Sequence, residues 1–237
     1  MSGRPVTRRG RGARSNPHNR FQQWRREPFD DGWDSEEVSA AKIETQLTPD
    51  PSRSVVGRND SPDVPFDRSI NPYRGCEHGC IYCFARPTHA YLDLSPGLDF
   101  ETRLFYKPDA ARLLREELMR PSYRCDLIGI GTNTDAYQPA ERNLGITREL
   151  LSVLNACKHP AGLITKSALI ERDIDILTEM ARDDLVQVQI SPTTLRPEIS
   201  RALEPRAAAP PSRYRKSRQC RDTGRPAGRA RHPRTDR

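Results

Sequence analysis

Hydrophobic positions between Ile70 and Leu203 alternate between the spacing of a strand and the spacing of a helix. Strand-like segments cover 69–75, 127–133, 162–167 and 185–191. Three helical segments lie between them, with inward-facing residues predicted to be Ala110, Leu113, Leu114 and Leu118, then Leu150, Leu151 and Leu154, then Ile170, Ile174, Leu177 and Ala181. This alternation predicts βαβ units, a parallel sheet and the α/β fold class.

The ends of these helices carry residues with known capping preferences. Asp109 and Thr147 are placed to cap the first two helices, and the second should stop near Pro160. A further short helix should begin at Pro197 and run through Leu203. At about 30 residues per βα unit, this stretch of the chain holds roughly four units.

Composition divides the chain into four parts. Residues 1–28 are rich in Arg and have no hydrophobic period, so we expect a disordered basic arm. Residues 29–69 are acidic and punctuated by Pro, and should form an extended lead-in to the core, residues 70–204. In residues 205–237, 22 of 33 residues are Arg, Pro, Ala or Gly, a mixture typical of a disordered basic tail or of a GC-rich gene translated out of frame.

The net charge of +7 over 237 residues comes from the two ends of the chain. Residues 1–28 carry +7 and residues 205–237 carry +9, whereas residues 29–204 carry −9. Basic ends suggest a nucleic-acid partner, and the competing interpretation is that they are only solvated. No run of about 18 apolar residues occurs, which excludes a transmembrane helix. The N-terminus lacks the apolar stretch of a secretory signal, so we expect a cytoplasmic protein with no membrane contact.

The candidate chemistry lies in a cysteine-rich loop, residues 75–86. Cys76, Cys80 and Cys83 have the spacing C-x3-C-x2-C, with an aromatic residue directly before the third cysteine. Three thiolates on one short loop can hold three irons of a 4Fe-4S cluster, which leaves the fourth iron open to a small molecule. Glycines at 75 and 79 let the loop backbone curl around such a cluster.

A zinc site is the alternative interpretation of this loop. His78 or His89 could complete a Cys3His set, and the spacing alone does not exclude it. We favour the cluster because structural zinc usually binds two separated pairs of ligands. Cys125 and Cys157 are expected to be packing residues, and Cys220 receives no role.

The cysteine spacing with its aromatic residue resembles the signature of radical S-adenosylmethionine (SAM) enzymes. The longer stretch SINPYRGCEHGCIYCFARPTHAYLDLSPG, together with GTNTDAYQPAER and LITKS, resembles the spore photoproduct lyase-related branch, often called DNA repair photolyase-like. This resemblance covers the chain from its N-terminal arm to about Arg206. It implies a partial TIM-type (βα) barrel of six units, of which about four are present here.

The resemblance also implies the cofactors and the reaction. Cys76, Cys80 and Cys83 would bind the 4Fe-4S cluster, whose open iron would chelate SAM. One electron, from a reductant of the flavodoxin or ferredoxin type, would cleave SAM to a 5′-deoxyadenosyl radical that abstracts a hydrogen atom from the substrate. The implied class is a lyase-like enzyme.

Five further residues match positions at which the family contacts SAM. Tyr82 would pack near the adenine, Thr134 and Asp135 would contact the methionine part, Lys166 its carboxylate, and Ser191 another part of SAM. The last four fall at the C-terminal ends of predicted strands, where α/β sheets bind ligands. Taken singly, Asp135 could cap a turn, Lys166 could be a solvated charge, and Ser191 could lead into a helix.

Two features depart from the resemblance. Thr132 stands where spore photoproduct lyase has a hydrogen-donating cysteine, so repair of thymine dimers by that route is not expected, and the substrate, nucleic acid included, stays open. Two units are also lacking, which predicts a truncated or frameshifted member that folds poorly and has little activity. The competing hypothesis is a zinc-containing nucleic-acid-binding protein that uses its basic ends.

Overall fold

The computed structural model describes residues 11–21 and 43–207. Its larger sheet has five strands in the order β2-β3-β6-β7-β8. The strands are β2 (Val56–Arg58), β3 (Arg68–Ile70), β6 (Ile128–Ile130), β7 (Ala161–Thr165) and β8 (Val186–Ile190). The last four run parallel to one another and β2 is antiparallel to β3. The α/β prediction is therefore confirmed, and four parallel strands agree with roughly four units.

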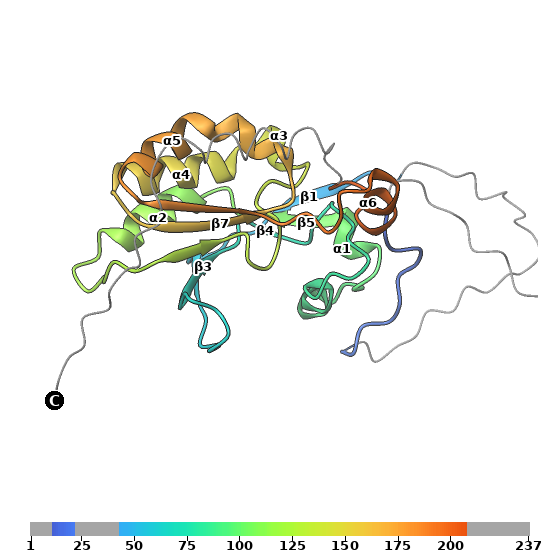
Figure 1. The fold of residues 1–237 in the computed structure, drawn as a ribbon. Helices are drawn as coiled ribbons and strands as arrows, with labels where there is room; N and C mark the ends of the chain where they lie inside the picture. Colours follow the sequence, from blue (N-terminus) through green and yellow to red (C-terminus); the bar gives the residue numbers. More distant parts are fainter. Residues whose placement is uncertain (1–10, 22–42, 208–237) are drawn as a thin grey trace, which may run out of the picture.

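Three helices cover one face of this sheet: α2 (Ala110–Leu118), α4 (Ile146–Ala156) and α5 (Ile174–Arg182) (Figure 1). Helix α4 packs between the other two. Its fully buried residues Leu150, Leu151 and Leu154 meet Leu114 of α2 and Leu163 of β7 in the main core. The predicted inward faces of the first two helices are thus correct at these positions.

Two details of the helices differ from the sequence predictions. Thr147 is not a cap, because α4 begins one residue earlier and the Thr147 hydroxyl donates to the carbonyl of Ala136 at 2.6 Å. The third predicted helix is broken into the 3-10 helix η2 (Ala168–Asp173) and α5. This break shifts the helical phase, so that Ile174 is exposed and Met180 is buried instead of Ala181.

A second, three-stranded sheet has the order β1-β5-β4. It contains β1 (Gln46–Pro49), β4 (Tyr73–Arg74) and β5 (Arg103–Tyr106). Strand β1, from the expected lead-in, pairs in parallel with β5, and β4 pairs antiparallel with β5. The cysteine loop leaves this sheet after β4 and continues into the 3-10 helix η1 (Arg86–Leu92), and the short helix α1 (Asp99–Thr102) leads back into β5.

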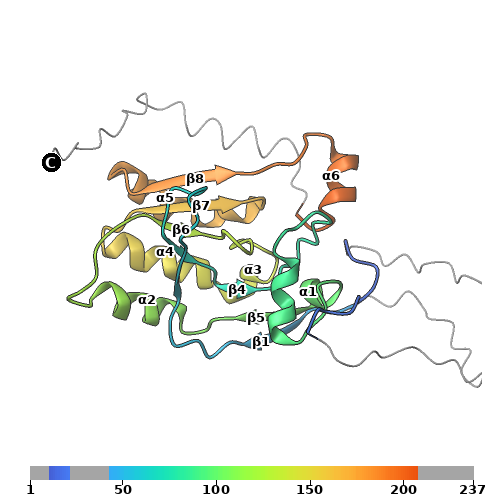
Figure 2. The same ribbon diagram turned by 90° about the horizontal axis from the view of Figure 1, so that it is seen from below.

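The larger sheet is open in the described part of the chain. Strand β8 has β7 as its one hydrogen-bonded neighbour there, and no strand closes the sheet into a barrel. The partial barrel inferred from the resemblance is therefore not shown. Helix α6 (Pro197–Leu203), which has the predicted bounds, lies beyond the end of β8, toward the same end of the molecule as α1 (Figure 2).

Three of the expected domain features, the arm (1–28), the lead-in (29–69) and the tail (205–237), fall partly outside the described residues. The tail from 208 onward lies outside, so its interpretation as basic tail or out-of-frame sequence stays a prediction. Residues 11–21 of the expected disordered arm are described and contact the body of the protein. Within the described ranges, none of the helices has the length and apolarity needed to cross a bilayer.

Candidate functional site

The cysteine loop is folded tightly by two glycines. Gly75 and Gly79 have φ values of +80° and +68°, a left-handed region that strains other residues. The Cys76 N–H donates to the Phe100 carbonyl at 2.9 Å, and the Cys83 N–H lies 3.3 Å from the Cys80 carbonyl. The loop thereby curls back on itself, as the sequence predicted.

The three thiols lie close enough to influence one another electrostatically. Cys76 and Cys80 are buried, Cys83 is half-buried, and all three are free thiols. Burial, and then the neighbouring Cys76 and Glu204, raise the pKa of Cys80 to about 12, although Lys166 opposes them. Burial also raises the pKa of Cys83, and Cys76 adds to this effect. A bound cationic group would reverse this balance and favour the thiolates, so the donor set suits a thiolate-bound iron–sulfur cluster.

The Cys3His zinc arrangement is not formed. His78 Nδ1 lies 3.3 Å from Asp135 Oδ2, and His89 Nε2 lies 2.9 Å from the Arg103 carbonyl. In residues 11–21 and 43–207, no three His, Cys, Asp or Glu side chains are placed to hold a metal ion. The binding of a cluster by the three cysteines stays a prediction, and the two histidines have other partners.

One side of the cysteine loop is held by the N-terminal segment, residues 11–21. The buried Glu101 carboxylate accepts hydrogen bonds from the N–H groups of Gly12 and Ala13 at 3.0 and 2.8 Å. It also pairs at 2.6 Å with Arg86, which donates to the Cys80 carbonyl. For these residues the structure differs from the expected disordered arm, because backbone N–H groups rather than a hydrophobic face fix the segment.

The other side of the loop is held by the chain that follows α6. The Ile81 N–H donates to the Leu203 carbonyl at 3.0 Å, and the Arg206 N–H donates to the His78 carbonyl at 3.2 Å. The Arg206 guanidinium also pairs with the buried Glu77 carboxylate at 3.0 Å. The loop therefore depends on segments that are far away in the sequence.

Thr134 and Asp135 are engaged with the protein itself. The buried Thr134 hydroxyl donates to the Tyr73 carbonyl at 2.8 Å. Asp135 Oδ1 accepts from the Thr165 hydroxyl at 2.7 Å, and Oδ2 accepts from the Lys166 N–H at 2.8 Å and lies near His78. Together they tie the ends of β6 and β7 to the cysteine loop.

His78 and Asp135 are the charged pair at this junction. Burial lowers the pKa of His78, but the Asp135 carboxylate and then Cys76 raise it to about 10 overall. Burial raises the pKa of Asp135, but His78, the Lys166 N–H and the Thr165 hydroxyl together lower it below its usual value. The pair is therefore charged near neutral pH, and the carboxylate orients the loop from inside.

Tyr82, Lys166 and Ser191 come together at the C-terminal ends of β7 and β8. Lys166 Nζ donates to the Ser191 carbonyl at 2.9 Å and lies 5.6 Å from the centre of the Tyr82 ring. Two residues that sequence reasoning missed join them. Glu204, directly after α6, lies 3.0 Å from Lys166 Nζ, and Thr193 donates to the same carboxylate.

The structure thus brings the eight predicted site residues to one end of the fold. Thr134 and Asp135 have internal partners, whereas Tyr82 is 49% exposed and Lys166 and Ser191 are half-buried. The one sequence signal for Glu204 was its place at the end of the periodic pattern.

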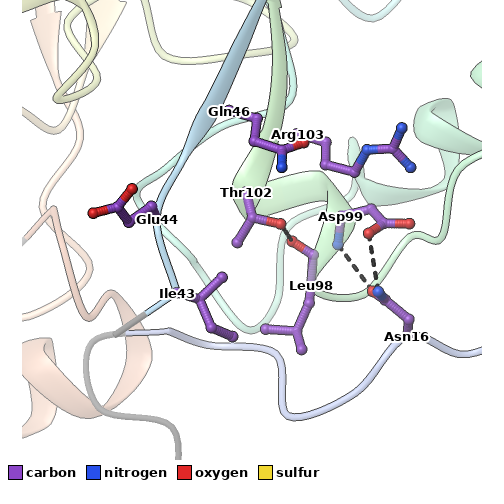
Figure 3. A pocket seen from close by; sticks show the side chains of 8 residues that line it. All are labelled: Asn16, Ile43, Glu44, Gln46, Leu98, Asp99, Thr102 and Arg103. Carbon is purple, nitrogen blue, oxygen red and sulfur yellow. Dashed lines mark hydrogen bonds between the residues drawn. The ribbon is translucent and has the colours of Figure 1, made fainter. Parts of the chain in front are cut away.

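A cavity of about 220 Å³ lies elsewhere, between the N-terminal segment, β1 and α1 (Figure 3). Asn16 and Asp99 bridge its edge through two hydrogen bonds of 2.9 Å. The lining residues are Asn16, Ile43, Glu44, Gln46, Leu98, Asp99, Thr102 and Arg103. None of the predicted site residues is among them.

Comparison with known proteins identifies relatives of the chain. An uncharacterized protein of Mycobacterium tuberculosis is 42% identical over 150 residues, which are 63% of this chain and 44% of that protein. An uncharacterized protein of Methanocaldococcus jannaschii is 23% identical over 136 residues, 57% of this chain and 48% of the relative. The chain spans about half the length, or less, of these curated relatives. No solved structure matches it.

A family model matches more of the chain than these relatives do. The model of the radical SAM superfamily covers residues 70–229. It therefore includes the cysteine loop and the ends of all four parallel strands, and it continues past Arg206, where the resemblance read from the motifs ended. The chain belongs to the radical SAM superfamily.

Proposed function

We propose that this chain binds a 4Fe-4S cluster through Cys76, Cys80 and Cys83 and reductively cleaves SAM. Superfamily membership indicates SAM-cleaving radical chemistry, and the finer statements are our proposal. The observation that carries it is the tightly folded loop that holds three free cysteines, with Lys166 beside Tyr82 of that loop, at the C-terminal ends of parallel strands. When bound, the cluster and SAM supply a 5′-deoxyadenosyl radical for hydrogen abstraction.

The residues around the cluster loop orient and charge the site. Lys166 provides a cation for the SAM carboxylate, and the exposed Tyr82 ring offers a face for the adenine. Ser191, whose carbonyl and hydroxyl lie near Lys166 Nζ, would contact another part of SAM. Thr134 and Asp135 act indirectly, because they hold the strand ends and His78 rather than facing solvent.

The substrate and the branch of the superfamily belong to the same proposal. We place the chain in the spore photoproduct lyase-related branch on its motifs, with a lyase-like reaction and a flavodoxin- or ferredoxin-type reductant in the cytoplasm. Thr132 accepts a hydrogen bond from Asn71 at 3.4 Å and offers no thiol as a hydrogen donor. Thymine-dimer repair by the route of spore photoproduct lyase is therefore not part of the proposal.

Anaerobic reconstitution with iron and sulfide tests the function. We expect a brown protein with broad visible absorption, which releases 5′-deoxyadenosine from SAM on reduction with dithionite. Cys80→Ala should lose most of the bound iron and sulfide, because two cysteines cannot hold the cluster. Cys157→Ala, which alters an exposed cysteine at the end of α4, is the matched control and should keep both. A colourless protein that holds one zinc ion would refute the proposal.

A further inference from the structure

The Glu204 carboxylate is held by a set of groups that bind anions. Its residue is 2% exposed, and its Oε1 atom lies 3.0 Å from Lys166 Nζ. The same oxygen accepts hydrogen bonds from the hydroxyl groups of Tyr82 and Thr193. Burial of a carboxylate is unfavourable unless it is paired and hydrogen-bonded, and here an ammonium and two hydroxyls meet that need.

The position of this carboxylate relates it to the cysteines. Tyr82 of the loop donates its hydroxyl to Glu204, and its ring lies 5.6 Å from Lys166 Nζ, so both charges lie against the cysteine loop. Lys166 itself is fixed by the Ser191 carbonyl at 2.9 Å. The ammonium is thus directed at Glu204, next to the loop where the proposed function places SAM.

We infer that Glu204 occupies the place of the SAM carboxylate at Lys166 and that SAM must displace it to bind. This inference rests on the proposed function. Two carboxylates that share one ammonium repel each other, so the ligand and Glu204 exclude one another there. Glu204 directly follows α6, and the carbonyl of the preceding Leu203 accepts a hydrogen bond from the Ile81 N–H. Because the backbone is tethered there, the displacement is a movement of the Glu204 side chain.

This competition makes Glu204 a residue that sets ligand affinity and selectivity. The apparent affinity for a ligand falls in proportion to the fraction of protein in the binding-competent state. A minor state populated at up to about 10% lowers the affinity at least about tenfold. The effect applies to ligands that carry a carboxylate and does not apply to adenosyl ligands without one.

Equilibrium dialysis of the cluster-reconstituted full chain under anaerobic conditions tests the inference. We expect Glu204→Gln to bind SAM at least about tenfold more tightly than the wild type, because the amide carries no charge to compete for Lys166. Binding of 5′-methylthioadenosine, which has no carboxylate, should be unchanged. Glu198→Gln, which alters an exposed glutamate on α6, is the matched control and should behave as the wild type.

The outcomes separate this inference from the proposed function. Equal or weaker SAM binding by Glu204→Gln, with 5′-deoxyadenosine still formed by the wild type, overturns the inference and leaves the function standing. Absence of SAM binding in every cluster-loaded variant overturns both. Glu204→Asp provides a second test if the first variant melts early, since its shorter side chain keeps the charge but withdraws it from Lys166. It should bind SAM more tightly than the wild type.

Discussion

Glu101 connects the N-terminal segment to the cysteine loop, and Glu101→Ala should destabilise the whole protein. The carboxylate is fully buried and bonds Gly12, Ala13 and Arg86. Its removal leaves the Arg86 side chain, which is 13% exposed, without its carboxylate. Breaking a buried ion pair from one side costs about 3–5 kcal/mol. We expect about 3 kcal/mol, because Arg86 still donates to the Cys80 and Gly97 carbonyls.

Urea denaturation of the reduced protein, followed by far-UV circular dichroism, measures this loss. With a slope of about 2 kcal/mol per molar urea, the midpoint should fall by about 1.5 M. The control is Glu116→Ala, which breaks an exposed i,i+4 pair with Arg112 and should cost about 0.5 kcal/mol or less. Equal shifts for the two variants would show that Glu101 contributes no more than a surface charge and would refute the reasoning.

Three further perturbations test the core, the loop and the acid limb of stability. Leu150→Ala empties a fully buried position and should cost about 2–5 kcal/mol in thermal or urea denaturation; a loss below 1 kcal/mol would contradict the packing. Gly79→Ala should lower the amount of iron and sulfide bound after reconstitution, because φ is +68° and the new Cβ would lie 2.9 Å from a carboxylate oxygen. The control Gly57→Ala meets no atom closer than 3.7 Å and should bind as much iron and sulfide as the wild type. Burial raises the pKa of Asp173, but hydrogen bonds from Arg172 and two other side chains lower it below 3.8 overall. The ionised carboxylate therefore stabilises the folded protein above that pH, and this stabilisation is lost as pH falls through the lowered pKa. Asp173→Asn should therefore be less stable at pH 7 and lose less stability below pH 4 in urea titrations at each pH, and parallel pH profiles would exclude this role.

Local sequence patterns predicted those helices and strands whose buried faces follow from their own residues. Pro197 predicted the start of α6, helical spacing predicted the inward faces of α2 and α4, and the apolar runs predicted β7 and β8. The predicted inward face of α5 was wrong because a break at Asp173 changes which residues of the helix face the core. That residue is buried against Tyr137 and two arginines, contacts that no local pattern contains.

The small sheet shows the same limit for strands. Strand β5 has only four residues, and its parallel partner β1 lies far earlier in the chain. Such short strands depend on distant partners rather than on their own propensity.

For the site, the sequence predicted candidate ligands but not the residues that position them. The cysteines were singled out by their spacing, and Lys166 and Ser191 by their resemblance to positions at which the family contacts SAM. The supporting acids carry no such signal: Gly12 and Glu101 are 89 positions apart, and Tyr82 and Glu204 are 122 apart. An isolated glutamate usually lies in solvent, so only the fold reveals that these carboxylates are buried and paired.

Strand β8 has a consequence for the behaviour of the purified protein. Its sequence, Val-Gln-Val-Gln-Ile, is uncharged and alternates apolar with polar residues, and its outer edge has no hydrogen-bonded strand among the described residues. Such a segment is a template for intermolecular strand pairing. Asp183 and Asp184 precede it and Pro192 follows it, the pattern of gatekeeper residues that oppose aggregation. The chain should therefore stay dispersed in dilute solution of low ionic strength and self-associate as salt screens those two aspartates.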